Sequence, residues 1–214
     1  MSISTERIVW IDCEMTGLDL TADALIEVAV LITDGELNIL DPGLDLVIKP
    51  SEEALAQMND FVRTMHTTSK LLDELPAGLE MADAEQQVLD YLSRYVPEAG
   101  KALLGGNSIG TDKTFLARDM PRVIDHLHYR VIDVSTVKEL ARRWYPRAYF
   151  QAPAKHGGHR ALGDIRDSIN ELRYYREAVF VPAPGPDSER SRAIAQQIDG
   201  ASASHGRPAE NQSV

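Results

Sequence analysis

The sequence predicts an α/β fold, in which helices flank a single mixed sheet. Three observations lead to this prediction: three strand-like segments open the chain, helices and strands alternate after residue 100, and a long amphipathic segment over residues 160–180 follows. This order is typical of a sheet with helices packed on it. With 214 residues, the chain has the length of one medium-sized domain with a substantial core.

The three opening strands are expected at residues 7–12, 24–33 and 44–49. The second, ALIEVAVLIT, is long and apolar, and the third alternates between apolar and polar residues. Turn signals separate them at Asp34-Gly35 and at Asp41-Pro42-Gly43. The pattern therefore predicts an antiparallel meander.

The pattern becomes helical over residues 51–93, as several short segments interrupted by Pro76 and Gly78. Residues 82–95 form the clearest amphipathic helix, because Val88 and Leu92 share one face. The remaining elements are expected as a strand at 101–104, a helix at 111–118, a strand at 130–133 and helices at 135–144 and 160–180.

The composition changes after residue 180. Residues 181–214 are rich in Pro, Gly, Ser and Ala and contain few large apolar side chains, so we expect a disordered tail with a transient helix over 191–198. The predicted folded domain is residues 1–180.

Hydrophobic residues make up 43% and charged residues 26% of the chain, as in ordinary soluble proteins. No apolar run approaches the roughly 20 residues of a membrane span, and the opening MSISTERIVW lacks the pattern of a signal peptide. The single cysteine, Cys13, cannot form an internal disulfide. We therefore expect a cytoplasmic protein without membrane contact.

The formal net charge of -11 argues against binding to long nucleic acids along a basic surface, because that mode needs many Lys and Arg contacts to phosphates. It does not exclude a short nucleic acid held in a local pocket through divalent cations.

The first strand carries two carboxylates, Asp12 and Glu14, among apolar residues. Side chains two positions apart on a strand point the same way, so these two converge. Like charges this close repel unless a cation lies between them. The alternative is a strand end that runs into a solvated turn at Thr16-Gly17.

Three further polar side chains lie where α/β sheets place functional sites. Asp112 follows the glycine-rich run GGNSIGT at the start of a helix, and its simpler interpretation is a helix cap. His159 and Asp164 lie where a second glycine-rich loop enters the last helix. Five residues apart, they cannot share one helical face, so His159 is expected on the loop and Asp164 on the helix. Taken singly, they would be a solvated histidine and a first-turn acid.

The combination is more specific than its members. Four carboxylates suit hard divalent ions such as Mg²⁺ or Mn²⁺, and two such ions can bind the attacking and leaving oxygens of a phosphodiester. A histidine can act as the general base, because this side chain titrates near neutral pH. The predicted site therefore consists of Asp12, Glu14, Asp112, His159 and Asp164.

These five residues accompany four longer blocks, DCEMTGLD, NSIGTDKTFLARDMP, HYRVIDVSTVKELARRW and HRALGDIRDSINELRYYRE. Together, over residues 7–180, they resemble the DEDDh exonuclease superfamily and its oligoribonuclease branch. The resemblance implies a ribonuclease H-like fold. It also implies a homodimeric 3′-to-5′ exonuclease that degrades RNA oligomers, chiefly 5′-phosphorylated dinucleotides, to mononucleotides. The linear dinucleotides left when cyclic dinucleotides are opened are among the implied substrates. In this family the four carboxylates bind two metal ions and the histidine is the base.

The resemblance also implies residues that select short substrates. Leu18 matches a leucine that inserts between the two bases. Phe61 stands where many members have a tryptophan that stacks on a base, and phenylalanine stacks with less area. The groups that grip the 5′-phosphate match Ser108, Arg130 and Ser135.

Tyr129 and His66 match residues that complete this phosphate cap from the other subunit.

Two other functions stay open. One is a DEDDh exonuclease that acts on longer RNA or DNA 3′ ends. The other is a catalytically silent nucleotide-binding module, against which the complete set of acids and histidine argues.

Overall fold

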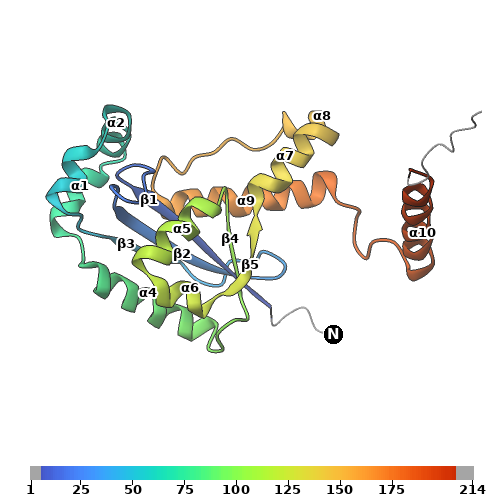
Figure 1. Cartoon of the computed structure of the whole chain (residues 1–214), viewed down its shortest axis with the longest axis horizontal. Helices are drawn as coiled ribbons and strands as arrows, with labels where there is room; N and C mark the ends of the chain where they lie inside the picture. Colours follow the sequence, from blue (N-terminus) through green and yellow to red (C-terminus); the bar gives the residue numbers. More distant parts are fainter. Residues whose placement is uncertain (1–5, 206–214) are drawn as a thin grey trace, which may run out of the picture. The chain divides into compact units, whose positions relative to one another are not determined.

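The computed structural model describes residues 6–205 of the chain. It divides into two compact units, Met1–Ala178 and Val179–Val214, each described here by itself. The first unit contains a five-stranded sheet with the strand order β3-β2-β1-β4-β5 (Figure 1).

The sheet is mixed, as expected. Strands β1 (Arg7–Met15), β2 (Leu25–Asp34) and β3 (Leu44–Val47) are antiparallel neighbours, which confirms the predicted meander. Strands β4 (Leu103–Gly106) and β5 (His128–Asp133) continue the sheet in parallel to β1. Strand β1 is therefore central, and β5 is an edge strand.

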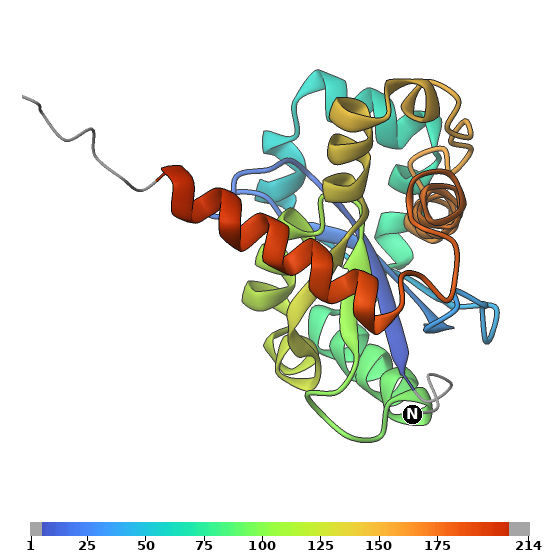
Figure 2. The same cartoon turned by 90° about the vertical axis from the view of Figure 1, so that its right-hand side faces the viewer.

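Strand β1 contributes to two separate cores, because its side chains alternate between the faces of the sheet. One face packs against α4 (Met81–Tyr95), α5 (Gly110–Asp119) and α6 (Pro121–His126). The other face packs against α9 (Ala161–Val179) through a cluster that includes Trp10. Figure 2 shows the sheet between these two helical layers.

The predicted short helices after β3 are α1 (Glu52–Gln57), α2 (Asp60–Thr68) and α3 (Leu71–Glu74), followed by a 3₁₀ turn over Leu75–Ala77. Met58, Leu71 and Leu75 cluster with Ile26 of β2. The Ser51 and Asn59 side chains cap α1 and α2 by accepting backbone N–H groups. This packing fixes α2 against the end of β1.

The segment between β5 and α9 contains α7 (Val134–Trp144) and α8 (Pro146–Tyr149). Asp133 caps α7 by accepting the N–H of Ser135, 2.8 Å away. Helix α8 was not expected from the sequence, because a single turn after Pro146 has no apolar period of its own. A loop over residues 150–160 then leads into α9.

The second unit contains α10 (Ser188–His205), a longer helix than the one expected over 191–198. It begins where Asp187 accepts the N–H of Arg190, and its composition of Ala, Ser, Gln, Glu and Arg favours a helix without a core. Residues 206–214 of the predicted tail lie outside the described residues. Across residues 6–205, none of the helices combines the length and apolar character that crossing a lipid bilayer requires.

Candidate active site

The predicted site residues lie along the edge of the sheet that is formed by the ends of its strands, not beside an outer strand. Strands β1 and β4 are parallel, so their carboxyl ends meet at this edge. Glu14 lies near the end of β1, Asp112 lies in the first turn of α5, and Asp164 lies in the first turn of α9. Three segments that are distant in the sequence therefore converge at this edge.

Asp12 and Glu14 project from the face of β1 that packs on α9, because they alternate with Ile11 and Cys13, which belong to the opposite core. Glu14 is buried and Asp12 is half-buried. A solvated turn is therefore not the explanation for these two carboxylates.

Asp112 contacts β1 directly. Its Oδ1 accepts the backbone N–H of Cys13 at 3.0 Å, between the two strand carboxylates. The helix that carries it shows no side-chain cap at Ile109, its N-cap residue. The structure thus places Asp112 at the predicted site, where it bonds across 99 positions of sequence to the strand.

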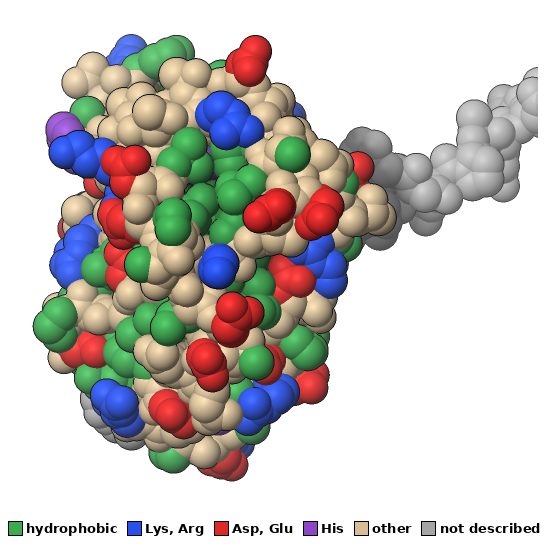
Figure 3. All heavy atoms as spheres, turned by 90° about the vertical axis from the view of Figure 1, so that its left-hand side faces the viewer, with side chains coloured by type: hydrophobic (Ala, Val, Ile, Leu, Met, Phe, Trp, Pro, Cys, Tyr) green, Lys and Arg blue, Asp and Glu red, His purple; other side chains and the backbone are tan. Residues whose placement is uncertain are grey.

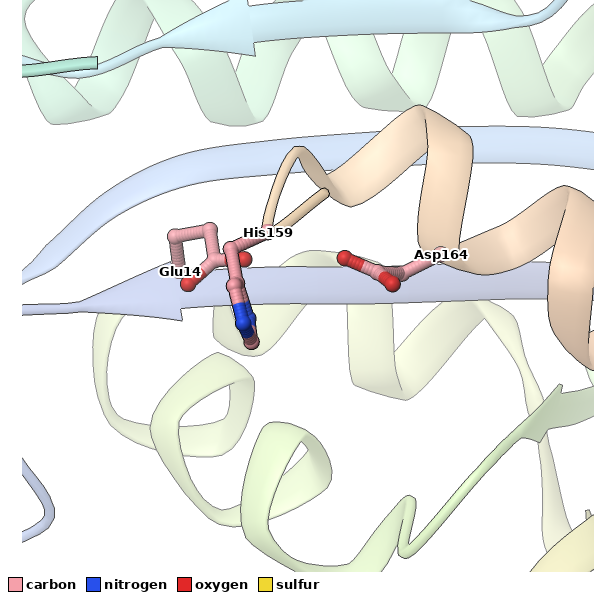
Figure 4. Close-up of side chains that lie close together, drawn as sticks. All are labelled: Glu14, His159 and Asp164. Carbon is pink, nitrogen blue, oxygen red and sulfur yellow. The ribbon is translucent and has the colours of Figure 1, made fainter. Parts of the chain in front are cut away.

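Glu14, His159 and Asp164 form a compact cluster, shown in Figure 4. One ligand atom from each lies within 4.8 Å of the others. As the sequence predicted, His159 lies on the loop and Asp164 on the helix. An imidazole and two carboxylates of this spacing can coordinate a metal ion or move a proton beside one.

Burial raises the pKa of all four carboxyl groups, and neighbouring acids add to the effect. The pKa of Glu14 rises to about 8, through burial first and then through Glu27 and Asp164. The pKa of Asp112 rises to about 7, chiefly through burial. Crowded negative charge of this kind fits divalent cations, and carboxylate oxygens are the ligands that Mg²⁺ and Mn²⁺ prefer.

Divalent cations should therefore stabilise the protein in a pH-dependent way. The raised pKa values mean that, without metal, the folded state binds protons that the unfolded state releases. This proton binding contributes to the free energy of unfolding at low pH. The contribution is lost as the pH rises from about 4, near the ordinary carboxyl pKa, to about 8, the pKa of folded Glu14. We expect Mn²⁺ at 100 times its Kd at pH 8 to raise the Tm by about 5–10 °C at that pH, and the same Mn²⁺ concentration to raise it by clearly less at pH 5.5, where protons compete for the carboxylates.

Thermal unfolding of EDTA-treated protein, with and without Mn²⁺, measures this effect. Sodium chloride at matched ionic strength is the control and should leave the Tm unchanged. Equal Mn²⁺ shifts at the two pH values would contradict the assignment of these carboxyl groups as the ligands.

Glu27 also belongs to the surroundings of this site, although it was not among the predicted site residues. It is fully buried and lies opposite Glu14 in the β1–β2 register. Its Oε1 accepts from Arg160 Nε at 2.7 Å, and its Oε2 accepts the N–H of Ala161 at 2.9 Å. The sequence contained a signal that could have selected Glu27, because, like Asp12, it is an acid inside an apolar strand.

The structure brings together two of the three residues predicted to bind the 5′-phosphate. Ser108 and Ser135 have their hydroxyl oxygens 3.0 Å apart, and the N–H of Ser108 donates to both Ser135 Oγ and Asp133 Oδ1. Arg130 lies on the edge strand β5, where its Nε donates to the hydroxyl of Tyr129 at 3.0 Å. Tyr129 itself is exposed.

A buried network under these serines was also missed. Ser135 Oγ donates to Asn107 Oδ1 at 3.1 Å, and Asn107 Nδ2 donates to Ser168 and to Glu171 of α9. Glu171 is buried and pairs with Lys138 at 3.1 Å. The serine pair is therefore anchored to the helix that carries Asp164.

Leu18 and Phe61, the predicted base contacts, are both strongly exposed, at 77% and 78%. Phe61 lines a pocket of about 490 Å³ together with Met65 of α2 and with Gly158 and His159 of the loop. The pocket thus connects the predicted stacking residue with the predicted base.

The expectation that His66 reaches the site from another subunit is wrong. Its side chain is fully buried within its own chain, in the last turn of α2. Its Nε2 hydrogen-bonds the Met15 carbonyl at 2.9 Å, and its Nδ1 lies 3.9 Å from Glu14 Oε2. The packing of α2 against the end of β1 places His66 beside the carboxylates of the same chain.

Known proteins match this chain along most of its length. The exonuclease family matches residues 9–172. An oligoribonuclease from Streptomyces griseus is 66% identical over 193 residues, which cover 90% of this chain and 96% of that protein. An oligoribonuclease from Streptomyces avermitilis is 67% identical over 190 residues, covering 89% and 95%.

Solved structures share the fold. Exonuclease I from Methylocaldum szegediense superposes with a TM-score of 0.62 at 19% identity, over 81% of this chain. The zinc-bound complex of E. coli exonuclease I with single-stranded DNA gives 0.63 at 13% identity, over 82% of this chain. The chain spans 41% of the length of each. This likeness confirms the ribonuclease H-like fold.

Proposed function

Because this chain belongs to the exonuclease family, and within it to the oligoribonucleases, we propose that it hydrolyses 5′-phosphorylated dinucleotides in preference to longer RNA. It is a 3′-to-5′ exoribonuclease; the proposal concerns the length of the substrate, the metal ions and the residues in each role. The observation that carries it is the cluster of Glu14, His159 and Asp164 beside the pocket that Phe61 lines.

We assign two divalent metal ions, Mg²⁺ or Mn²⁺, to Asp12, Glu14, Asp112 and Asp164. The donor set fits them, since crowded carboxylates with raised pKa values need positive charge. When bound, such ions activate water and neutralise charge on the reacting phosphate.

His159 accepts the proton of the attacking water. As the water oxygen bonds to phosphorus, the bond from phosphorus to the 3′-oxygen of the preceding nucleotide breaks. The 3′-oxygen leaves and takes up a proton from solvent water, so the products are a nucleoside 5′-monophosphate and an oligomer shortened by one nucleotide that ends in a 3′-hydroxyl. The position of His159 between the Phe61 pocket and the carboxylates supports this role.

The preference for dinucleotides follows from groups at the two ends of the site. Leu18 and Phe61 expose apolar surface on which bases can stack. We assign the 5′-phosphate to Ser108, Arg130 and Ser135. A terminal phosphate carries more charge than a diester, so an arginine with hydroxyl groups distinguishes a chain end from its interior.

A short substrate held in this way does not need a basic surface that contacts the phosphates along a long nucleic acid, which fits the acidic character of the protein. On the face shown in Figure 3, acidic, basic and hydrophobic side chains are interspersed. We further propose a cytoplasmic location, which fits the buried free thiol of Cys13. The activity is assigned to residues 1–180, with residues 181–214 as an appended tail.

We also propose a homodimer that forms through the region from β5 to α8. This region combines an edge strand with exposed large apolar side chains, and such surfaces favour protein contacts. The exposed apolar side chains of this region are Tyr129, Val131, Leu140, Trp144, Tyr145 and Phe150. Tyr129 would then contact the 5′-phosphate end of the substrate in the partner.

Trp144→Glu should dissociate this dimer. Buried interface tryptophans contribute about 2 kcal/mol or more, which corresponds to a Kd at least about 30-fold higher. Sedimentation velocity at micromolar protein measures the change, with Leu40→Glu, on the loop between β2 and β3, as the control. A wild-type protein that sediments as a monomer would exclude the dimer.

The test of the function uses 5′-phosphorylated RNAs of two to seven nucleotides, with Mg²⁺ or Mn²⁺ and an EDTA control. We expect the dinucleotide to turn over about 10–100 times faster than the heptamer, because charge-assisted contacts to its phosphate contribute about 1.5–3 kcal/mol. A dinucleotide with a 5′-hydroxyl should react more slowly by a similar factor.

Equal or faster turnover of the heptamer would remove the preference for dinucleotides and favour an exonuclease for longer 3′ ends. Without metal-dependent cleavage of any substrate, the chain would be a nucleotide-binding module instead.

A further inference from the structure

The loop that carries His159 has an unusual backbone. Gly158 and His159 both have left-handed conformations, with φ of 69° and 60°. For a residue with a β-carbon this conformation costs roughly 1–2 kcal/mol, so it persists only where the surroundings hold it. The contacts on either side of these two residues show what holds them.

A carboxylate of α9 holds the segment before them. Asp167 Oδ2 accepts the backbone N–H groups of His156 and Gly157, at 2.5 and 2.7 Å. Asp167 lies three positions after Asp164 on the same helix and is half-buried. The loop is therefore tied to the helix that carries one of the proposed metal ligands.

A second carboxylate holds the segment after them. Glu27 accepts from Arg160 Nε and from the N–H of Ala161, the two residues that follow His159. On its other side, the Arg160 guanidinium donates to Glu74 of α3 at 2.7 and 3.1 Å. The acceptor of both bonds, Glu27, is a fully buried side chain of strand β2.

Two glycines let the loop pack closely on α9. A β-carbon at Gly157 would lie 2.4 Å from Asp164 Oδ1 and 2.6 Å from the Asp164 nitrogen. One at Gly163 would lie 2.8 Å from the Gly157 carbonyl oxygen. Neither glycine was among the predicted site residues. In the structure they allow the loop to contact the first turn of α9.

We propose that Asp167 and Glu27 are positioning residues of the nuclease reaction. They hold the two ends of the histidine loop, and the left-handed pair Gly158–His159 between them presents the imidazole to Glu14 and Asp164. The loop is thus fixed before substrate binds. The inference rests on the proposed function, since it takes His159 as the base.

Variants of Asp167 test the inference, because replacing the fully buried Glu27 would test folding as well. Asp167→Ala should lower kcat about 10-fold or more for a 5′-phosphorylated adenosine dinucleotide with Mn²⁺, since a base displaced by 1 Å costs up to about 100-fold. KM should stay within about two-fold, because the substrate contacts lie elsewhere. Asp167→Asn should stay near wild type, since its amide oxygen accepts the same two N–H groups.

The matched control is Asp34→Ala. Asp34 also accepts two backbone N–H groups in a loop, those of Glu36 and Asn38 at 2.9 Å, but in the turn after β2. Its kcat should equal that of the wild type. The deciding measurement repeats Asp167→Ala in a His159→Ala background, where a residue that acts through the histidine should change kcat less than two-fold.

An equal loss of kcat from Asp167→Ala in both backgrounds, or an equal loss from Asp34→Ala, would reduce Asp167 to a general structural role and overturn the inference. So would Asp167→Asn behaving like Asp167→Ala, which would point to charge instead of loop geometry. If His159→Ala alone keeps wild-type turnover, the proposed base is wrong. A severe loss of kcat in His159→Ala together with an unchanged kcat in Asp167→Ala would instead keep His159 as the base and overturn the positioning role of Asp167.

Discussion

Asp112→Ala should lower the turnover of a 5′-phosphorylated dinucleotide by at least about three orders of magnitude, or about 4 kcal/mol of transition-state stabilisation. Asp112 connects the start of α5 to β1 through the N–H of Cys13, between two other acids. Its removal takes away one of four proposed metal ligands. Steady-state kinetics with Mn²⁺ over a range of concentrations measures the loss.

Folding must survive for this result to count. Asp112 contacts the strand at Cys13, whose backbone N–H it accepts, and the core on that face is built from apolar residues, so the domain should stay folded in Asp112→Ala. The control is Asp90→Ala, an exposed acid on α4 whose carboxylate accepts from Gln86. Unchanged turnover in Asp112→Ala would remove Asp112 from the metal site.

His159→Ala should lower kcat by about 10²–10⁴, the usual contribution of a general base. Binding of Mn²⁺ and the KM for the dinucleotide should change little, because the carboxylates and the side chains that contact the nucleobases remain. The histidine lies within 4.8 Å of Glu14 and Asp164, and this position requires the left-handed backbone of the loop.

The loop offers a matched control for this variant. His156 is an exposed histidine three residues earlier, and its backbone N–H donates to Asp167. His156→Ala should therefore keep wild-type kcat. A loss of Mn²⁺ affinity in His159→Ala equal to its loss of kcat would make His159 a metal ligand instead of the base.

The sequence predicted the elements whose patterns are local. Alternation within β1 and the turns around β2 were sufficient to predict the meander and to place Asp12 and Glu14 on one face. Asp112 was harder, because a carboxylate in a first helical turn looks the same whether it caps its helix or bonds to a strand 99 positions away. Only the combination with the other acids selected it.

Other features depend on contacts that no local pattern contains. The position of Glu27 in an apolar strand is a local signal, but its hydrogen bond to Arg160 spans 133 positions, so its partner is known only from the packing of β2 beside the start of α9. His66 was expected to complete the phosphate cap from the other subunit, but the packing of α2 on β1 places its side chain against its own chain. Helix α10 formed where the lack of apolar residues had favoured disorder, since helix propensity needs no core.

The fork of Arg160 has a consequence for the response of the protein to salt. One branch binds the fully buried Glu27, and the other binds Glu74, which is 45% exposed. Mobile ions screen exposed pairs strongly and buried pairs weakly. Rising ionic strength therefore loosens the link from this guanidinium to α3, next to the helix that carries Phe61, while the link to the central sheet persists. One guanidinium thus makes a salt-sensitive link to α3 and a salt-resistant link to the sheet.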